Sequence, residues 1–186
     1  MGLQGILLYT GRAMAFALCI GILWFFKELV VNTGKLNFLN RRFCLELVFV
    51  CYIAALVQII VIRDFTSFFS FWERAHSLSS IQFIPLKTTL AEVKNGLWPF
   101  LYHVVGNMIW FVPFGALAPA LLPYLRKFFV FLVFAVCCSL CLEILQWTFV
   151  TGISDVDDIL LNALGAAAGW PFWRTAYSKI VKTDSK

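Results

Sequence analysis

Five long apolar runs constrain the fold of this sequence more than any other feature does. The runs cover residues 6–26, 44–62, 101–122, 128–150 and 157–174. A helix that crosses a bilayer needs about 20 mainly apolar residues, and each run is close to that length. The sequence therefore predicts an all-α polytopic membrane bundle of about five transmembrane helices, with residues 1–186 forming a single domain. The fifth run is rich in Ala and Gly, so we expect it to pack among the other helices.

The composition indicates that lipid is the solvent. Apolar residues make up 61% of the chain and charged residues 13%. Soluble domains have roughly 45–50% apolar and about 25% charged residues, so a water-soluble core could not bury this much apolar surface. The net charge of +5 would suggest nucleic acid for a soluble protein. Here the Lys and Arg residues lie between apolar runs and near the C-terminus, so we expect no nucleic-acid partner.

Basic residues in alternate connections predict the orientation of the chain. Lys and Arg favour the cytoplasmic side of a membrane. The first and third connections and the C-terminal tail carry Lys27, Lys35, Arg41, Arg42, Arg126, Lys127, Arg174, Lys179, Lys182 and Lys186. With five spans, all of these lie on one side when the N-terminus is outside and the C-terminus is cytoplasmic.

The second connection, residues 63–100, is not an ordinary linker. Phe and Trp residues crowd its beginning, and apolar residues follow at 81–86 and at Trp98. This content predicts a segment that lies in the membrane interface or dips partly into it. Two interpretations stay open for it: a lid or lipid-binding shelf, or a passive aromatic anchor.

The third run contains polar and helix-bending residues. His103 and Asn107 are four residues apart and share one helix face. Pro113 cannot donate a hydrogen bond to the carbonyl of residue 109, so we expect a bend there, near Gly115. The run is either bent for packing, with Asn107 bonded to a neighbouring helix, or it contributes to a binding site.

The fourth run contains Glu143 and Gln146 on one face. A central ionisable residue costs about 2.5–3.5 kcal/mol on an insertion scale, whereas each Leu, Ile, Phe or Val contributes about 0.3–0.6 kcal/mol in favour. The run has fourteen such residues, which together give roughly 4–8 kcal/mol. Insertion therefore tolerates Glu143 without requiring it, and an intramembrane carboxylate suggests a functional site.

The fifth run begins with acidic residues that fall on one stripe with Asn162. Asp158 and Asn162 lie inside the run and are candidate site residues, whereas Asp155 is either a site residue or a helix N-cap. The lower half of the same stripe contains Gly165 and Gly169, which predict close helix packing.

The polar residues of three runs fall at one depth. Asn107 and Glu143 lie six and seven residues from the predicted outer ends of their runs, which is roughly 10 Å at 1.5 Å per residue. Asp158 and Asn162 lie near the same level. We therefore expect one polar layer, open to the outer leaflet. Arg63 begins the second connection on the same side and could pair with one of these carboxylates.

Ordered motifs in the C-terminal half resemble those of a known family. The motifs are Gly106-Asn107 with Phe111-Val112-Pro113-Phe114-Gly115, then Glu143-Ile144-Leu145-Gln146, and then Asp155-Val156-Asp157-Asp158 with Asn162-Ala163-Leu164-Gly165. Their combination resembles the VanZ-like family over about residues 81–170. The upstream Phe83-Ile84-Pro85-Leu86 is similar to a short N-x-I-P-F-type element of that family, although Phe83 stands where a polar residue is frequent.

The resemblance implies a protein of the bacterial cytoplasmic membrane. The family's namesake is associated with resistance to teicoplanin, a glycopeptide antibiotic that carries a lipid, and less with vancomycin. Possible resistance of this kind is an expectation for this chain.

Three functions stay open at this stage. The first is binding or modulation, at the outer leaflet, of membrane lipid, a lipid-linked cell-wall precursor or a lipoglycopeptide. The second is an enzyme acting on a lipid-linked headgroup, with Glu143 as acid or base and with Asp157, Asp158 and His103 as weak candidates for holding a cation. The third is a small transporter or an assembly partner. We expect no cofactor.

Overall fold

The computed structural model describes residues 3–31, 41–62 and 80–175. The helices are α1 (Leu3–Val31), α2 (Arg41–Val57), α4 (Lys87–Asn95), α5 (Leu97–Leu121), α6 (Phe128–Thr148) and α7 (Val156–Gly169). Three short turns add to them: the π-helical turn η1 (Gln58–Ile62) and the 3-10 turns η4 (Pro123–Arg126) and η5 (Trp170–Phe172). Two short strands, β1 (Ile81–Gln82) and β2 (Ser154–Asp155), pair in parallel.

Among the described residues, four helical segments are long and apolar enough to cross a membrane, which confirms the predicted all-α membrane bundle. They are Thr10–Val31, Arg42–Ile62, Leu97–Leu121 and Phe128–Thr148. The fifth predicted span forms α7, which has 14 residues and a length of about 21 Å at 1.5 Å per residue. That is shorter than a hydrocarbon core of about 30 Å.

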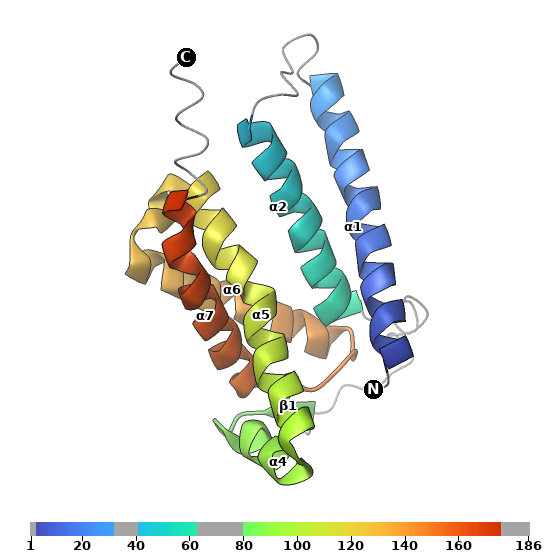
Figure 1. The fold of residues 1–186 in the computed structure, drawn as a ribbon, viewed down its shortest axis with the longest axis vertical. Coiled ribbons are helices and arrows are strands. Elements are labelled where there is room, and N and C mark those ends of the chain that lie inside the picture. Colours follow the sequence, from blue (N-terminus) through green and yellow to red (C-terminus); the bar gives the residue numbers. More distant parts are fainter. Residues whose placement is uncertain (1–2, 32–40, 63–79, 176–186) are drawn as a thin grey trace.

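The helices form two groups (Figure 1). The long helix α1 lies along α2 on one side, and α5, α6 and α7 lie together on the other. Many apolar side chains of α1 point away from the protein, among them Leu8, Met14, Leu18, Ile22, Leu23 and Phe26. This exposure suits a helix that faces lipid.

The core lies where α5, α6 and α7 meet the end of α2. Phe111 and Phe131 are fully buried there, and the ring of Phe114 stacks on that of Phe134 with centroids 6.0 Å apart. The hydroxyl group of Tyr52 on α2 donates a hydrogen bond to the carbonyl oxygen of Trp110 on α5, at 2.7 Å. The two helix groups are therefore joined by both apolar and polar contacts.

Backbone contact joins α5 and α7 through three glycines, which we call the glycine seam. A methyl group at Gly165 would overlap the carbonyl oxygen of Met108, and one at Gly169 would overlap that of Val112. A methyl group at Gly115 would overlap the carbonyl oxygen of Ala166 on the facing helix. The predicted close packing at Gly165 and Gly169 is confirmed. Helix α5 continues through Pro113 and Pro119 as one element.

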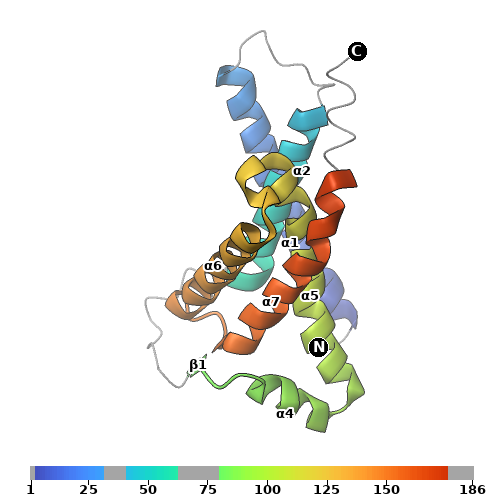
Figure 2. The same ribbon diagram turned by 90° about the vertical axis from the view of Figure 1, so that its left-hand side faces the viewer.

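The short helix α4 crosses the end of the bundle where α5 and α7 begin (Figures 1 and 2). We call this the α4 end. Just before α4, strand β1 pairs with β2, so that Ile81 lies beside Ser154 and Gln82 beside Asp155. The chain before α4 is thus fixed to the connection between α6 and α7.

Candidate functional site

The carboxylate of Asp157 caps the N-terminus of α4 from another helix, α7. One of its oxygens accepts a hydrogen bond from the backbone N–H of Leu86. The other accepts from the backbone N–H and from the hydroxyl group of Thr89, each at 2.9 Å. The first N–H groups of a helix have no partner within it, so a carboxylate there is stabilising. We call this arrangement the Asp157 cap.

The Asp157 cap also holds an unusual backbone conformation. Leu86 precedes α4 with φ 63° and ψ 3°, a left-handed conformation that costs roughly 1–2 kcal/mol for a residue other than Gly. Its N–H points at the carboxylate of Asp157, which is 1% exposed. The bonds made by the cap offset this cost and fix the angle at which α4 leaves the strand.

Asp158, the next residue of α7, joins two residues of α5. Its Oδ1 atom accepts a hydrogen bond of 2.6 Å from the side-chain amide of Asn107. The same oxygen lies 3.7 Å from Nδ1 of His103, an ion pair when the imidazole is protonated. The side chains of His103 and Asp158 are 15% and 20% exposed. These three residues form what we call the polar cluster, and a ligand at the α4 end could reach it.

Thr89 connects the polar cluster to the Asp157 cap. Its hydroxyl oxygen lies 3.4 Å from Nε2 of His103 and donates its proton to Asp157. When Nε2 carries a proton, a chain of donors therefore runs from His103 through Thr89 to Asp157. The two neighbouring carboxylates of α7 thus approach His103, one directly and one through Thr89.

Glu143 joins α6 to the start of α7. Its side chain is 4% exposed, and Oε2 accepts a hydrogen bond from the backbone N–H of Asp155 at 3.0 Å. The hydroxyl group of Ser154 donates to the backbone carbonyl of Glu143 at 2.7 Å. Asp155 in turn accepts from the backbone N–H of Asp157 at 2.9 Å, which confirms its role as the N-cap of α7.

Two further predicted residues are buried deeper. The side-chain amide of Asn162 donates to the hydroxyl group of Ser139 at 2.9 Å. Gln146 is 2% exposed, and its backbone carbonyl accepts from the backbone N–H of Thr151. Within the described part of the chain, the side-chain carbonyl oxygens of Gln146 and Asn162 accept no hydrogen bond.

The structure divides the predicted polar layer into separate contacts. It brings His103, Asn107 and Asp158 together, whereas Glu143 and Gln146 contribute to the α6 side. Arg63, proposed as a partner for a carboxylate on this side, lies outside the described residues.

Sequence reasoning missed three hydroxyl residues, Thr89, Ser139 and Ser154. Ser139 lies four residues before Glu143, and Ser154 directly precedes Asp155. A hydroxyl group one helical turn from a buried acid, or beside a helix N-cap, is the signal that could have found these two. Thr89 shows no such signal, because its partner is 68 residues away.

The geometry does not favour a cation held by Asp157. All three donors around its carboxylate are protein groups. Among residues 3–31, 41–62 and 80–175, no group of three or more His, Cys, Asp or Glu residues is placed to hold a metal ion. What the arrangement offers chemically is a half-buried carboxylate, imidazole and amide that can exchange hydrogen bonds with a polar headgroup.

Comparison with known proteins places this site in a family context. The sequence model of the family described as VanZ/LLP1 matches residues 49–177. The match reaches beyond the motifs at 81–170 and takes in the second half of α2. Neither the curated proteins nor the solved structures give a match.

Proposed function

This chain belongs to the VanZ/LLP1 family, and from that premise we propose that it binds a lipid-linked component of the bacterial cell envelope. A lipoglycopeptide of the teicoplanin type has the same two parts, a lipid and a polar sugar and peptide portion. We propose that such molecules approach the α4 end from the outer leaflet and that binding there gives teicoplanin resistance.

The polar cluster is the observation that carries this proposal. His103, Asn107 and Asp158 offer donors and acceptors at one place. Exposed apolar side chains lie close by at the beginning of α5, where Trp98 is 70% exposed and Tyr102 is 54% exposed. A ligand with an apolar tail and a polar headgroup matches both surfaces.

The distribution of basic residues supports an outer location for the α4 end. The described ends of the helices away from α4 carry five basic residues, Lys27, Arg42, Arg126, Lys127 and Arg174, whereas α4 carries two, Lys87 and Lys94. Because Lys and Arg favour the cytoplasm, we propose that this opposite end is cytoplasmic. The membrane we propose is the bacterial cytoplasmic membrane.

Catalysis is the second candidate function. Its support comes from Thr89 and His103, whereas the sequence predicted Glu143 as the acid or base. The order Thr89, His103, Asp158 resembles a hydroxyl group, a base and a group that orients the base. However, the hydroxyl group of Thr89 donates to Asp157 at 2.9 Å, whereas His103 is 3.4 Å away. Glu143 holds the backbone of Asp155, which gives this carboxylate a structural role. Binding is therefore the better supported function.

Antibiotic susceptibility tests the proposal. A sensitive Gram-positive host would express the wild-type protein, Asp158→Asn, or the control Glu46→Gln, at matched membrane levels. Glu46 pairs with Arg42 at the start of α2, far from the polar cluster. We expect the wild type and Glu46→Gln to raise the inhibitory concentration of teicoplanin more than that of vancomycin, and Asp158→Asn to lose the effect. Equal resistance from Asp158→Asn would contradict a role for the polar cluster.

A further inference from the structure

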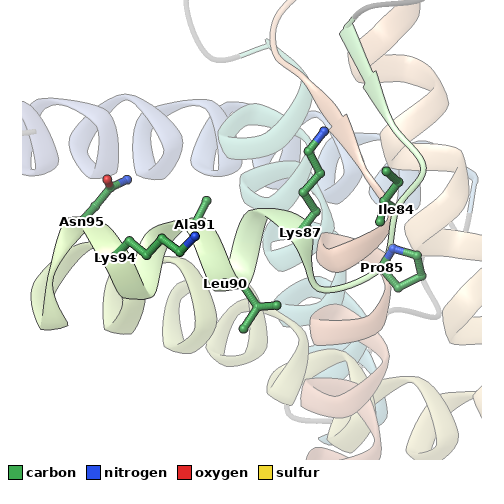
Figure 3. A pocket seen from close by; sticks show the side chains of 7 residues that line it. All are labelled: Ile84, Pro85, Lys87, Leu90, Ala91, Lys94 and Asn95. Atoms are coloured by element: carbon green, nitrogen blue, oxygen red, sulfur yellow. The ribbon is translucent and has the colours of Figure 1, made fainter.

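A pocket with a volume of about 530 Å³ opens on the outer surface of α4 (Figure 3). Ile84 and Pro85 line it from the segment before the helix, and Lys87, Leu90, Ala91, Lys94 and Asn95 line it from the helix itself. The five helix residues are spaced three, one, three and one residues apart, so they lie on one helix face. We call this site the α4 pocket.

The α4 pocket has a positive charge at each end and an apolar middle. Figure 3 shows Lys87 and Lys94 toward opposite ends of α4, with Ala91 between them. They are seven residues apart, which is roughly 10 Å along the helix at 1.5 Å per residue. Both side chains are long enough to reach a group placed between them.

No carboxylate lines the α4 pocket. On the same helix, Glu92 accepts a hydrogen bond from the side-chain amide of Asn95 at 3.2 Å. The carboxylate of Asp157 is buried beneath the first turn and is occupied by Leu86 and Thr89. Neither lysine forms an ion pair with any residue of the described chain. The positive charge of the pocket is therefore available to an anion.

Helix stability does not account for Lys87. The first turn of a helix favours acidic residues and disfavours basic ones, because the helix dipole is positive there. The first turn of α4 has no acidic residue, and Lys87 is its first residue. Lys94, by contrast, lies in the last turn, where a positive charge is favourable. The carboxylate of Asp157 offsets part of the helix dipole at this end, and an anion in the α4 pocket would give the exposed ammonium group of Lys87 a partner of its own.

We propose that the α4 pocket binds the diphosphate group of a membrane lipid. This inference rests on the proposed function and assigns one part of the same ligand. A phosphodiester of an ordinary phospholipid carries one negative charge, whereas a diphosphate carries at least two and can meet both ammonium groups. Leu90 and Val93 are 60% and 52% exposed, and they offer an apolar surface to the first part of the lipid chain.

The Asp157 cap relates this pocket to the polar cluster. Lys87 lies between Leu86 and Thr89, the two residues that Asp157 holds, and Thr89 contacts His103. Lys87 and Thr89 are two residues apart and so lie on different faces of α4, with Lys87 at the pocket and Thr89 toward His103. The sugar or amide group beyond the diphosphate would pass around α4 to meet the polar cluster.

Binding of short prenyl probes tests the proposal. The full-length protein would be purified in phosphatidylcholine nanodiscs, and native mass spectrometry would give its affinity for farnesyl diphosphate, farnesyl monophosphate and farnesol. We expect the diphosphate to bind most tightly. Each of Lys87→Gln and Lys94→Gln should weaken it about tenfold, which corresponds to about 1.4 kcal/mol. Lys127→Gln, an exposed lysine between α5 and α6, is the control and should bind as the wild type does.

Three results would overturn the proposal. One is unchanged diphosphate affinity in the variant with both Lys87→Gln and Lys94→Gln. Another is equal binding of farnesol and farnesyl diphosphate. The third is equal binding of farnesyl diphosphate and of phosphatidylglycerol introduced into the nanodiscs, which would indicate a site for any anionic lipid. Both lysines are exposed, so an unchanged melting temperature should accompany each variant. If Asp158→Asn abolishes teicoplanin resistance while the lysine variants bind normally, the proposed function stands and this pocket assignment fails.

Discussion

The two contacts that α7 makes along its length differ in kind. Its C-terminal half meets α5 through the glycine seam, where backbone approaches backbone. Its first turn meets α4 through one buried carboxylate, the Asp157 cap. The seam depends on the absence of side chains, whereas the cap depends on the presence of one. Small changes in the seam should therefore affect the whole bundle, and changes in the cap should affect only the α4 end.

The seam and the cap also belong to different parts of the molecule: the seam lies in the packed bundle, and the cap lies beside the proposed binding residues. The polar cluster and the α4 pocket both lie at the α4 end, which is at the bottom of Figure 1, whereas the seam lies farther up α7. A helix held by few contacts can move at a lower cost than one packed along its length. We infer that the seam supplies the rigid frame and that α4 supplies the part able to adjust to a ligand.

The largest expected effect comes from filling the seam. A methyl group at Gly165 overlaps a backbone carbonyl oxygen, which no rotamer change can relieve. Overpacking of this kind costs typically about 1–3 kcal/mol and occasionally more. We expect Gly165→Ala to lower the melting temperature in detergent and the yield of monodisperse protein.

Gly106→Ala is the matched control for that change. A methyl group at Gly106, also on α5, meets nothing within 4 Å. Replacing a helical Gly by Ala can add about 1 kcal/mol of stability, so this variant should melt at the wild-type temperature or above it. Equal destabilisation by both variants would show that the seam is not the rigid frame.

A smaller and more local effect should follow from removing the cap. Asp157→Ala leaves the N–H groups of Leu86 and Thr89 without their acceptor. Hydrogen bonds to charged groups contribute about 1.5–3 kcal/mol, which corresponds to roughly tenfold or more in local opening. Hydrogen exchange of the α4 amides should therefore accelerate, while exchange in α5 and α7 changes little.

Glu92→Ala serves as the control on the same helix. Glu92 accepts an exposed hydrogen bond from Asn95, so its loss should leave exchange in α4 close to that of the wild type. If Asp157→Ala instead unfolds the whole bundle, the distinction between seam and cap is wrong.

The seam could be predicted from the sequence, and the cap could not. Small residues four apart in an apolar run indicate close helix packing, and this holds for Gly165 and Gly169. The rise per residue placed Asn107 and Asp158 at one depth, and they are bonded. Asp157, by contrast, was only a weak candidate for holding a cation. Two of its three donors are backbone N–H groups, which every residue except proline has, so no residue type identifies them.

Glu143 is a second residue whose hydrogen-bond partner the sequence pattern did not predict. A carboxylate in an apolar run predicts a functional site, yet in the structure its described hydrogen bond is to the backbone N–H of Asp155. The shared depth with Asn107 indicated one layer, but depth along a helix does not say which way a side chain turns. Glu143 of α6 meets the backbone just before α7, and Asn107 of α5 meets the side chain of Asp158.

The smallest expected effect concerns one hydroxyl group and sharpens the account of the cap. Thr89→Val keeps the shape of the side chain and the backbone N–H bond to Asp157 but removes the hydroxyl donor. One hydrogen bond to a charged group contributes about 1.5–3 kcal/mol, so α4 amides should exchange about tenfold faster, short of the change in Asp157→Ala, which loses the backbone bonds as well. Thr89→Ser keeps the donor and should behave as the wild type in the same exchange experiment. If Thr89→Val instead matches Asp157→Ala, the hydroxyl group rather than the two backbone N–H groups holds α4, and His103, which contacts that hydroxyl group, becomes part of the cap.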